Sequence, residues 1–468
     1  MYRTSLPFLD PRKSIYWSAS SHPLNSLRRM ATRISSSFHY TRQIRRQGGF
    51  GNSAITGHAA VRASASSHSA SSAARAAATR RVAAAVAAAA CQAKPSLARV
   101  WREIQGSNDW QDLVAPLHPL LRDEVVRYGE FVNACYKAFD LDPTSKRYLN
   151  CKYGKKSLMR ELGMERSGYE VTKYIYATPD IVFPMHHTAC CSRWMGYVAV
   201  SSEEETQRLG RRDVLITFRG TVTGSEWIAN LMSSLTPARL DPHEPRPEVK
   251  VEVGFLSMYT SDDSTSRFGM DSCREQLLSE LSRLITKHRG EELSITFSGH
   301  SMGSSLAILA GYDIAELGLN QGIPTTVYSF AGPRVGNADF KARCEELGLK
   351  VLRIVNVNDP VTKLPGVFLN ENMRAWCAKH ELPWSCSCYA HVGVELALDF
   401  FRMRDPACVH DLEAYIRLLR CPDVMQVQEE EDDFLLKAIR LLSSCKFDAK
   451  LWHEAAVNMG NLMQSLGI

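Results

Sequence analysis

One short motif in the chain has the residue types and spacing of a nucleophilic site. Residues 293–310 read LSITFSGHSMGSSLAILA, in which a β-rich run ends in GHSMG and a helix of small and apolar residues begins at once. A Gly-x-Ser-x-Gly turn between a strand and a helix is so tight that it strains the serine backbone and exposes its hydroxyl. Both glycines are needed, because larger side chains there would collide. We therefore predict that Ser301 is a catalytic nucleophile.

A serine nucleophile of this type needs an acid and a base further along the chain, in that order. Asp359 follows the β-rich run 351–356 by one short loop, which Pro360 stiffens. Catalytic groups lie beyond the carboxyl ends of strands in this architecture. His410 lies in a loop between a strand and a helix, whereas His391 begins a strand and would lie at the wrong end of the sheet. We predict Asp359 as the acid, His410 as the base and His391 as a structural residue.

The elements around these residues predict an α/β fold. Residues 121–139 have apolar side chains at the three- and four-residue spacing of an amphipathic helix. Short β-rich runs occur at 196–200, 214–218, 293–297, 325–330, 351–355 and 391–400, and helical stretches at 270–287, 302–317, 337–347 and 411–419. Strands that alternate with helices indicate a mostly parallel sheet with helices on both faces. Together with the serine motif, this pattern predicts the α/β-hydrolase fold.

The charge of the chain is unevenly distributed. The net charge is +6, but residues 1–94 alone carry +13, with 12 Arg, 2 Lys and a single acid, and they also contain 16 Ser. A segment rich in Arg and Ser and poor in acids is typical of a transit peptide, and the serine content favours a chloroplast over a mitochondrion. The alternative is a low-complexity tail without a targeting role. The remaining residues carry −7 and show no basic face for nucleic acid.

The sequence indicates neither a zinc site nor a transmembrane helix. The chain has 13 Cys, but none has the paired C-x-x-C spacing of a zinc site. We expect mostly buried thiols in a reducing compartment, with a redox pair within residues 377–388 as an alternative. No run of 18 apolar residues occurs, so we expect no transmembrane helix.

Six motifs occur in order along the chain. They are FRGT at 218–221, FSGHSMG at 297–303, YSFAGPRVGN at 328–337, NVNDPVTKLPG at 356–366, YAHVGVEL at 389–396 and VHDLEAYI at 409–416. Together they resemble the class 3 lipases over roughly residues 100–425. The resemblance is close to the plant plastid acylhydrolases of the phospholipase A1 type, the "defective in anther dehiscence"-like group.

The resemblance implies roles for several residues. The family's triad matches Ser301, Asp359 and His410, and Thr221 and the backbone N–H of Met302 would form the oxyanion hole. Residues 223–231 match a mobile lid helix, in which the apolar side chains are Trp227, Ile228 and Leu231. The alternative is that these three side chains pack in the core. The family uses no metal or organic cofactor.

These observations predict a transit peptide at 1–94, a helical extension at 95–170, a catalytic domain at 171–425 and a second helical extension at 426–468. The predicted function is a serine acylhydrolase that releases fatty acids, from the sn-1 position, from plastid phospholipids or galactolipids at a lipid surface, through an acyl-serine intermediate. A non-catalytic lipase-fold scaffold that binds lipid or protein partners is the alternative from another class. A small-molecule or feruloyl-type esterase is an alternative within the enzymes. The head group, the positional preference between sn-1 and sn-2, and the oligomeric state stay open.

Overall fold

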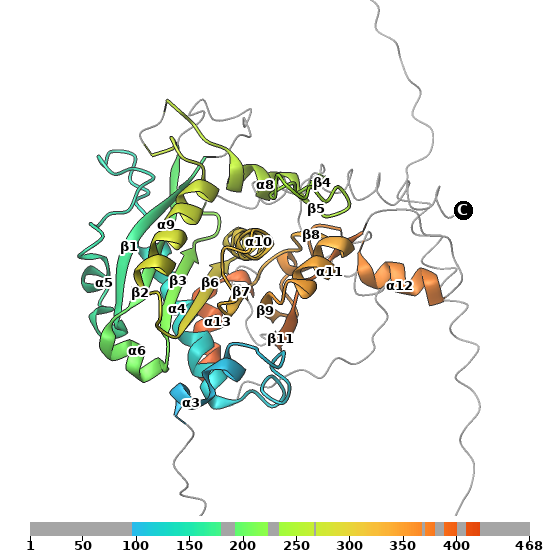
Figure 1. The fold of residues 1–468 in the computed structure, drawn as a ribbon, viewed down its shortest axis with the longest axis horizontal. Helices are drawn as coiled ribbons and strands as arrows, with labels where there is room; N and C mark the ends of the chain where they lie inside the picture. Colours follow the sequence, from blue (N-terminus) through green and yellow to red (C-terminus); the bar gives the residue numbers. More distant parts are fainter. Residues whose placement is uncertain are drawn as a thin grey trace, which may run out of the picture. The chain divides into compact units, whose positions relative to one another are not determined.

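The computed structural model describes residues 96–178, 192–222, 234–265, 268–366, 370–379, 388–399 and 409–421. The predicted transit peptide and the predicted extension at 426–468 lie outside these ranges. The described residues contain one seven-stranded sheet with helices on both faces, and one smaller sheet beside it (Figure 1). No helix in these ranges is long and apolar enough to cross a membrane.

The large sheet is mostly parallel, as predicted. Its strands, in spatial order, are β1 (Tyr169–Ala177), β2 (Arg193–Ser201), β3 (Arg212–Phe218), β6 (Leu293–His300), β7 (Thr325–Phe330), β9 (Lys350–Asn356) and β11 (Val394–Leu398). Strands β3, β6, β7, β9 and β11 pair in parallel, and β2 pairs antiparallel with both β1 and β3. Every residue of β3, β6 and β7 is buried, as expected for parallel strands covered on both faces.

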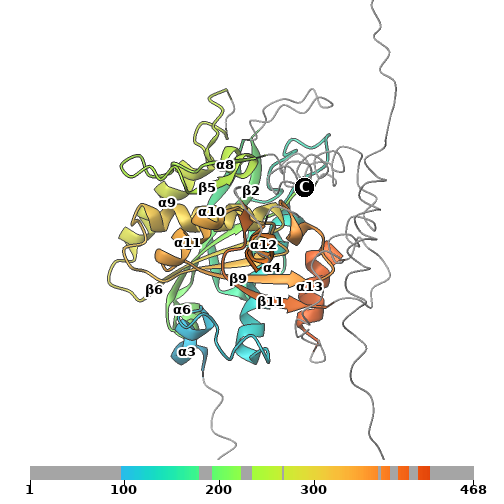
Figure 2. The same ribbon diagram turned by 90° about the vertical axis from the view of Figure 1, so that its right-hand side faces the viewer.

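Helices cover the sheet on two sides. One face packs against α3 (Leu97–Ile104), α4 (Pro119–Ala138) and α13 (Leu412–Leu419), and the other against α8 (Val253–Thr260), α9 (Cys273–Lys287), α10 (Met302–Glu316) and α11 (Ala338–Glu346). Figure 2 shows α10 and α11 on one side of β9 and β11, and α13 on the other. Each face therefore has its own hydrophobic core, and the sheet lies between them.

The smaller elements lie at the edges of this framework. They are α5 (Leu158–Glu161), η1 (Glu165–Ser167), α6 (Glu203–Leu209), η2 (Val361–Lys363) and α12 (Glu371–Lys379). The second sheet has the order β10 (Tyr389–Ala390), β8 (Gly336–Asn337), β5 (Lys250–Glu252) and β4 (Leu235–Pro237), and all its pairs are antiparallel.

Two strands of the large sheet differ from the sequence-based expectation, and the smaller sheet was not predicted. Strand β1, at the edge of the large sheet, was not predicted, and most of its residues are only partly buried. The strand predicted at 391–400 is shorter in the structure, where β11 begins at Val394. Gly393 adopts a φ of +88°, and a Cβ there would lie 2.1 Å from the Val351 carbonyl oxygen, so the chain turns at this residue before it can pair.

Candidate active site

Ser301 lies in the sharp turn between β6 and α10, and it is only 3% exposed. Its backbone has φ 57° and ψ −127°, which is a strained conformation for a residue with a side chain. A Cβ at Gly299 would lie 2.2 Å from the Gly303 carbonyl oxygen, and a Cβ at Gly303 would lie 2.5 Å from the Arg219 carbonyl oxygen. Both glycines are therefore required by close backbone approach.

The structure brings Ser301, His410 and Asp359 together. His410 Nε2 lies 2.9 Å from Ser301 Oγ, and His410 Nδ1 lies 2.7 Å from Asp359 Oδ2. These residues are up to 109 positions apart in the sequence. A serine, an imidazole and a carboxylate in this chain of hydrogen bonds can transfer a proton from the hydroxyl to the ring and stabilise the charged ring.

Asp359 is held rigidly in the loop after β9, where its side chain is fully buried. Its Oδ1 accepts from the Val361 N–H at 2.9 Å, and its Oδ2 accepts from the Tyr415 hydroxyl at 3.2 Å. Burial and the Asp359 charge raise the pKa of Tyr415 well above its usual range, so the phenol keeps its proton and donates it. Tyr415, on α13, was not identified from the sequence, because nothing in a helical run indicates which tyrosine faces a buried carboxylate.

His300 does not contact the Ser301 hydroxyl but links three parts of the site. Its Nδ1 lies 2.7 Å from the hydroxyl of Tyr136 on α4, and its Nε2 lies 3.0 Å from the His410 carbonyl oxygen. The same Tyr136 oxygen accepts from the Gly220 N–H at 2.7 Å. The Tyr136 hydroxyl therefore donates to His300 Nδ1, and His300 Nε2 donates to the backbone carbonyl oxygen of His410. Sequence analysis missed Tyr136, which lies 164 residues before its partner.

The predicted oxyanion-hole residues lie beside the serine. Gly220 is packed so closely that a Cβ there would be 2.9 Å from Ser301 Cβ. Thr221 follows it, and its Oγ1 lies 3.9 Å from the Met302 sulfur. Within the described residues, neither the Thr221 nor the Met302 backbone N–H donates a hydrogen bond. Two unused donors beside a nucleophile can stabilise an oxyanion.

Several known proteins are similar to this chain in sequence. A family model described as "Lipase (class 3)" matches residues 215–369. "Galactolipase DONGLE, chloroplastic" of Arabidopsis thaliana is 60% identical over 382 residues, covering 79% of this chain and 81% of that protein. The chain belongs to the class 3 lipases. "Phospholipase A1-Ialpha2, chloroplastic" of the same plant is 64% identical over 349 residues, 72% of each chain. "Phospholipase A1 EG1, chloroplastic/mitochondrial" of Oryza sativa subsp. indica is 58% identical over 384 residues, covering 80% and 87%.

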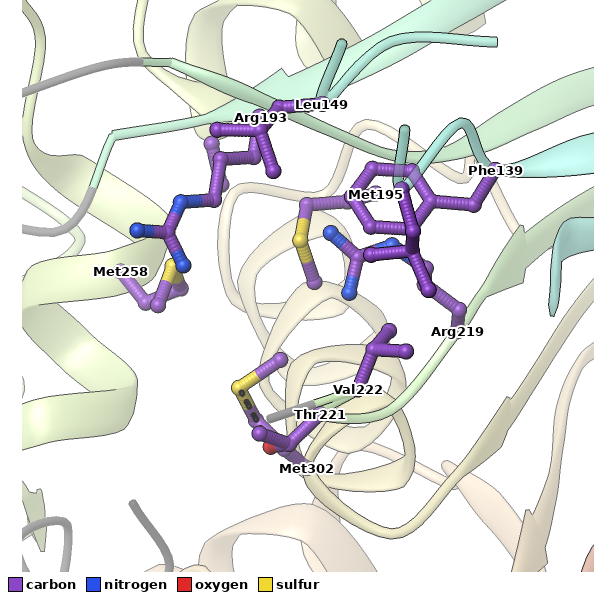
Figure 3. A pocket seen from close by; sticks show the side chains of 11 residues that line it. Phe139, Leu149, Arg193, Met195, Arg219, Thr221, Val222, Met258 and Met302 are labelled. Atoms are coloured by element: carbon purple, nitrogen blue, oxygen red, sulfur yellow. Dashed lines mark hydrogen bonds between the residues drawn. The ribbon is translucent and has the colours of Figure 1, made fainter. Parts of the chain in front are cut away.

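The lipase has a pocket beside its serine. Thr221 and Met302 form part of its wall (Figure 3). Eight apolar side chains line it: Phe139, Leu141, Leu149, Ala177, Met195, Val222, Met258 and Met302. The other lining residues are Arg193, Arg219 and Thr221. A largely apolar pocket next to the nucleophile fits a fatty acyl ester.

The other predicted residues of the lipase have different locations. His391 precedes β11, at the amino end of that strand, and its backbone N–H donates to Glu371 Oε1 at 3.1 Å. The lid residues Trp227, Ile228 and Leu231 lie outside the described residues, so their role stays a prediction. In the described part of the chain, no group of three or more His, Cys, Asp or Glu could hold a metal ion. Free thiols occur at Cys135, Cys151, Cys273, Cys344, Cys388 and Cys421, and all of these except Cys421 are buried.

Proposed function

We propose that this lipase is a serine acylhydrolase of plastids that releases fatty acids, from the sn-1 position, from membrane phospholipids or galactolipids. The observation that carries the proposal is the pair of hydrogen bonds by which His410 joins Ser301 at 2.9 Å and Asp359 at 2.7 Å. The strained turn at Ser301 and the adjacent apolar pocket support it.

The reaction begins with transfer of the Ser301 proton to His410 Nε2 as the serine oxygen attacks the ester carbonyl. Asp359 accepts the Nδ1 proton, which fixes the ring tautomer and stabilises the imidazolium that forms. The hydrogen bonds from Val361 and Tyr415 keep the carboxylate in this orientation. The Thr221 and Met302 backbone N–H groups would donate to the negative oxygen of the tetrahedral intermediate.

The second half of the reaction reuses the same residues. His410 returns its proton to the leaving alcohol, which leaves the acyl group on Ser301. His410 then takes a proton from a water molecule, which attacks the acyl-serine and releases the fatty acid. The amino end of α10 directs its dipole and unpaired N–H groups at the developing charge in both steps.

The substrate class is taken from the pocket and from the relatives. Curated relatives carry the names galactolipase and phospholipase A1, which suggests glycerolipids as substrates of this protein. Eight apolar side chains in the pocket support an acyl chain there, and their burial by the chain would favour binding. We infer that the enzyme works at the surface of a lipid membrane.

The test uses the full-length chain. Purified protein should react with a fluorophosphonate probe and release fatty acid from phosphatidylcholine or monogalactosyldiacylglycerol. Ser301→Ala should lose both activities, with a fall in kcat of roughly 10³-fold or more. Ser282→Ala, at an exposed position on α9, is the matched control and should keep both. A folded wild type that neither reacts with the probe nor releases fatty acid would favour a non-catalytic scaffold that binds lipid or protein.

A plastid location is the second part of the proposal. The +13 charge of residues 1–94 and their single acid support a transit peptide. Three curated relatives have names that include the word chloroplastic, and one of these also includes mitochondrial. A fluorescent protein fused after residue 94 should enter chloroplasts of leaf cells. Exclusively mitochondrial or secretory fluorescence would contradict this part of the proposal.

A further inference from the structure

Two arginine side chains line the pocket beside Ser301, and no carboxylate neutralises either of them among the described residues. Arg219 is 4% exposed, and its Nε and Nη1 donate to the carbonyl oxygens of Trp194 and Gly220, both at 2.9 Å. Its guanidinium carbon lies 3.8 Å from the centroid of the Phe139 ring. Arg193 is half-buried, and its Nε is a buried donor without an acceptor.

Both cations line the same pocket without an acidic partner, which sets them apart from other arginines of the domain. Burial and the charge of Arg193 lower the pKa of Arg219 to about 10, so Arg219 is still protonated at neutral pH. Other arginines of the same sheet have acidic partners. Arg212 pairs with Glu203 at 2.8 Å and with Glu291 at 2.6 Å. Carbonyl oxygens and an aromatic ring do not neutralise a guanidinium charge, so an anion that enters this pocket would be favoured there.

The position of the cations indicates which anion they could receive. Figure 3 shows both guanidinium groups at the wall of the pocket that also contains Thr221 and Met302. An ester carbonyl held by the backbone N–H groups of Thr221 and Met302 therefore places the rest of the lipid beside Arg193 and Arg219. In a glycerophospholipid, only the three glycerol carbons separate the sn-1 ester from the phosphate oxygen. Guanidinium groups bind phosphate through two parallel, charge-assisted hydrogen bonds.

We propose that Arg193 and Arg219 form a subsite for the phosphodiester of a glycerophospholipid substrate. The inference rests on the proposed function, because it assumes that a lipid ester is cleaved at Ser301. A galactolipid head group offers hydroxyls but no charge, and an acyl chain alone would leave both cations unneutralised. The subsite therefore favours phospholipids over galactolipids when the acyl chains are the same.

The test compares two lipids that differ only in head group. Dihexanoyl phosphatidylcholine and dihexanoyl monogalactosylglycerol are both used as monomers, so that no membrane surface charge contributes. Arg193 is the residue to change, because Arg219 donates a hydrogen bond to the Gly220 carbonyl oxygen and so supports that loop. For Arg193→Gln, the ratio of kcat/KM on the phospholipid to kcat/KM on the galactolipid should fall about tenfold, the loss expected for one charge-assisted hydrogen bond.

Two further variants separate charge from packing. Arg193→Lys keeps the charge and should restore part of the ratio. Arg289→Gln removes an exposed arginine from the loop before β6, at the opposite end of the sheet, and should leave the ratio at the wild-type value. A ratio that is unchanged in Arg193→Gln, including one left unchanged by an equal loss of kcat/KM on both lipids, would overturn the proposal. A fall in the ratio that is equal in the Lys and Gln variants would also overturn it.

The remaining outcomes separate this proposal from the proposed function. If the wild type cleaves the galactolipid but not the phospholipid, the proposed phosphodiester subsite is wrong, whereas the proposed acylhydrolase activity is supported. A wild type that cleaves neither lipid would overturn both. In a further outcome, hexanoate inhibits the wild type but not Arg193→Gln, while the ratio of the two kcat/KM values stays unchanged. That result would show that the cations bind the carboxylate of the product, and it would overturn the proposed phosphodiester subsite.

Discussion

The rings of His300 and His410 lie against each other, with their centroids 4.9 Å apart. Burial, and then the neighbouring His410, lower the pKa of His300 well below its usual range. His300 is therefore neutral when His410 takes up the serine proton, so it adds no positive charge beside the imidazolium. Instead it holds the backbone carbonyl of His410 and ties it, through Tyr136, to the loop at Gly220.

This chain of hydrogen bonds predicts that Tyr136 positions the base and the oxyanion loop together. Tyr136→Phe removes one donor and one acceptor and leaves the Gly220 N–H without a partner. We expect kcat on a short monomeric ester to fall roughly three- to tenfold, with KM little changed. Tyr148→Phe is the control, because Tyr148 is 40% exposed. A loss of thermal stability with an unchanged kcat would mean that Tyr136 only supports the fold.

The two candidate histidines should behave differently. His410→Ala removes the group that lies 2.9 Å from Ser301 Oγ, and we expect no turnover and no labelling by a fluorophosphonate in a folded protein. His391→Ala should keep labelling and mainly lower stability, because His391 lies at the amino end of β11. Labelling of His410→Ala at the wild-type rate, with none in folded His391→Ala, would reverse the assignment.

His391 also predicts a pH dependence of stability. Burial and the charges of Arg353 and Arg334 lower its pKa well below the ordinary 6.5. Lys341 and Lys363 add to this effect, and Glu371 accepts the His391 backbone N–H. The unfolded chain then binds a proton that the folded chain does not, so stability is lost as the pH falls below 6.5. The expected slope is up to about 1.4 kcal/mol per pH unit.

The measurement is chemical unfolding between pH 7 and pH 5. His391→Gln should flatten the pH dependence by this amount, because glutamine does not titrate. His243→Gln, at an exposed position, should keep the wild-type slope. An unchanged slope in His391→Gln would show that this histidine is protonated equally in the folded and unfolded chains.

Gly220→Ala should disable the oxyanion loop. The new methyl group would lie 2.5 Å from the Tyr136 hydroxyl and 2.7 Å from the His300 carbonyl oxygen. Relief of these contacts must move the loop that presents the Thr221 N–H, so we expect kcat to fall by roughly 10²-fold or more. Gly154→Ala, whose Cβ would meet only Ser157 Oγ at 3.8 Å, is the control. Wild-type kcat in folded Gly220→Ala would exclude this loop from the reaction.

The sequence predicted the parallel strands and the positions of Ser301, Asp359 and His410 because each rests on a local pattern. Strand β6 is a β-rich run in which Leu, Ile and Phe alternate with Ser and Thr, and the turn after it has glycines where side chains would collide. The contacts of Tyr136 and Tyr415 could not be predicted in this way. Each depends on how a helix packs on the sheet, and amphipathic spacing defines the buried face of a helix but not the partner of one hydroxyl. Arg193 was missed for the same reason, since it lines the pocket only once β2 is paired.

The contacts of His300 join segments that are far apart along the chain. It contacts Tyr136 across 164 positions and His410 across 110. Closing such long loops costs chain entropy before any contact forms, and folds dominated by distant contacts fold slowly. The nucleophile turn is local and can form early, but it has no base until α13 docks against α4. Return of activity during refolding therefore requires this docking, and recovery of helix content alone does not show that the enzyme is restored.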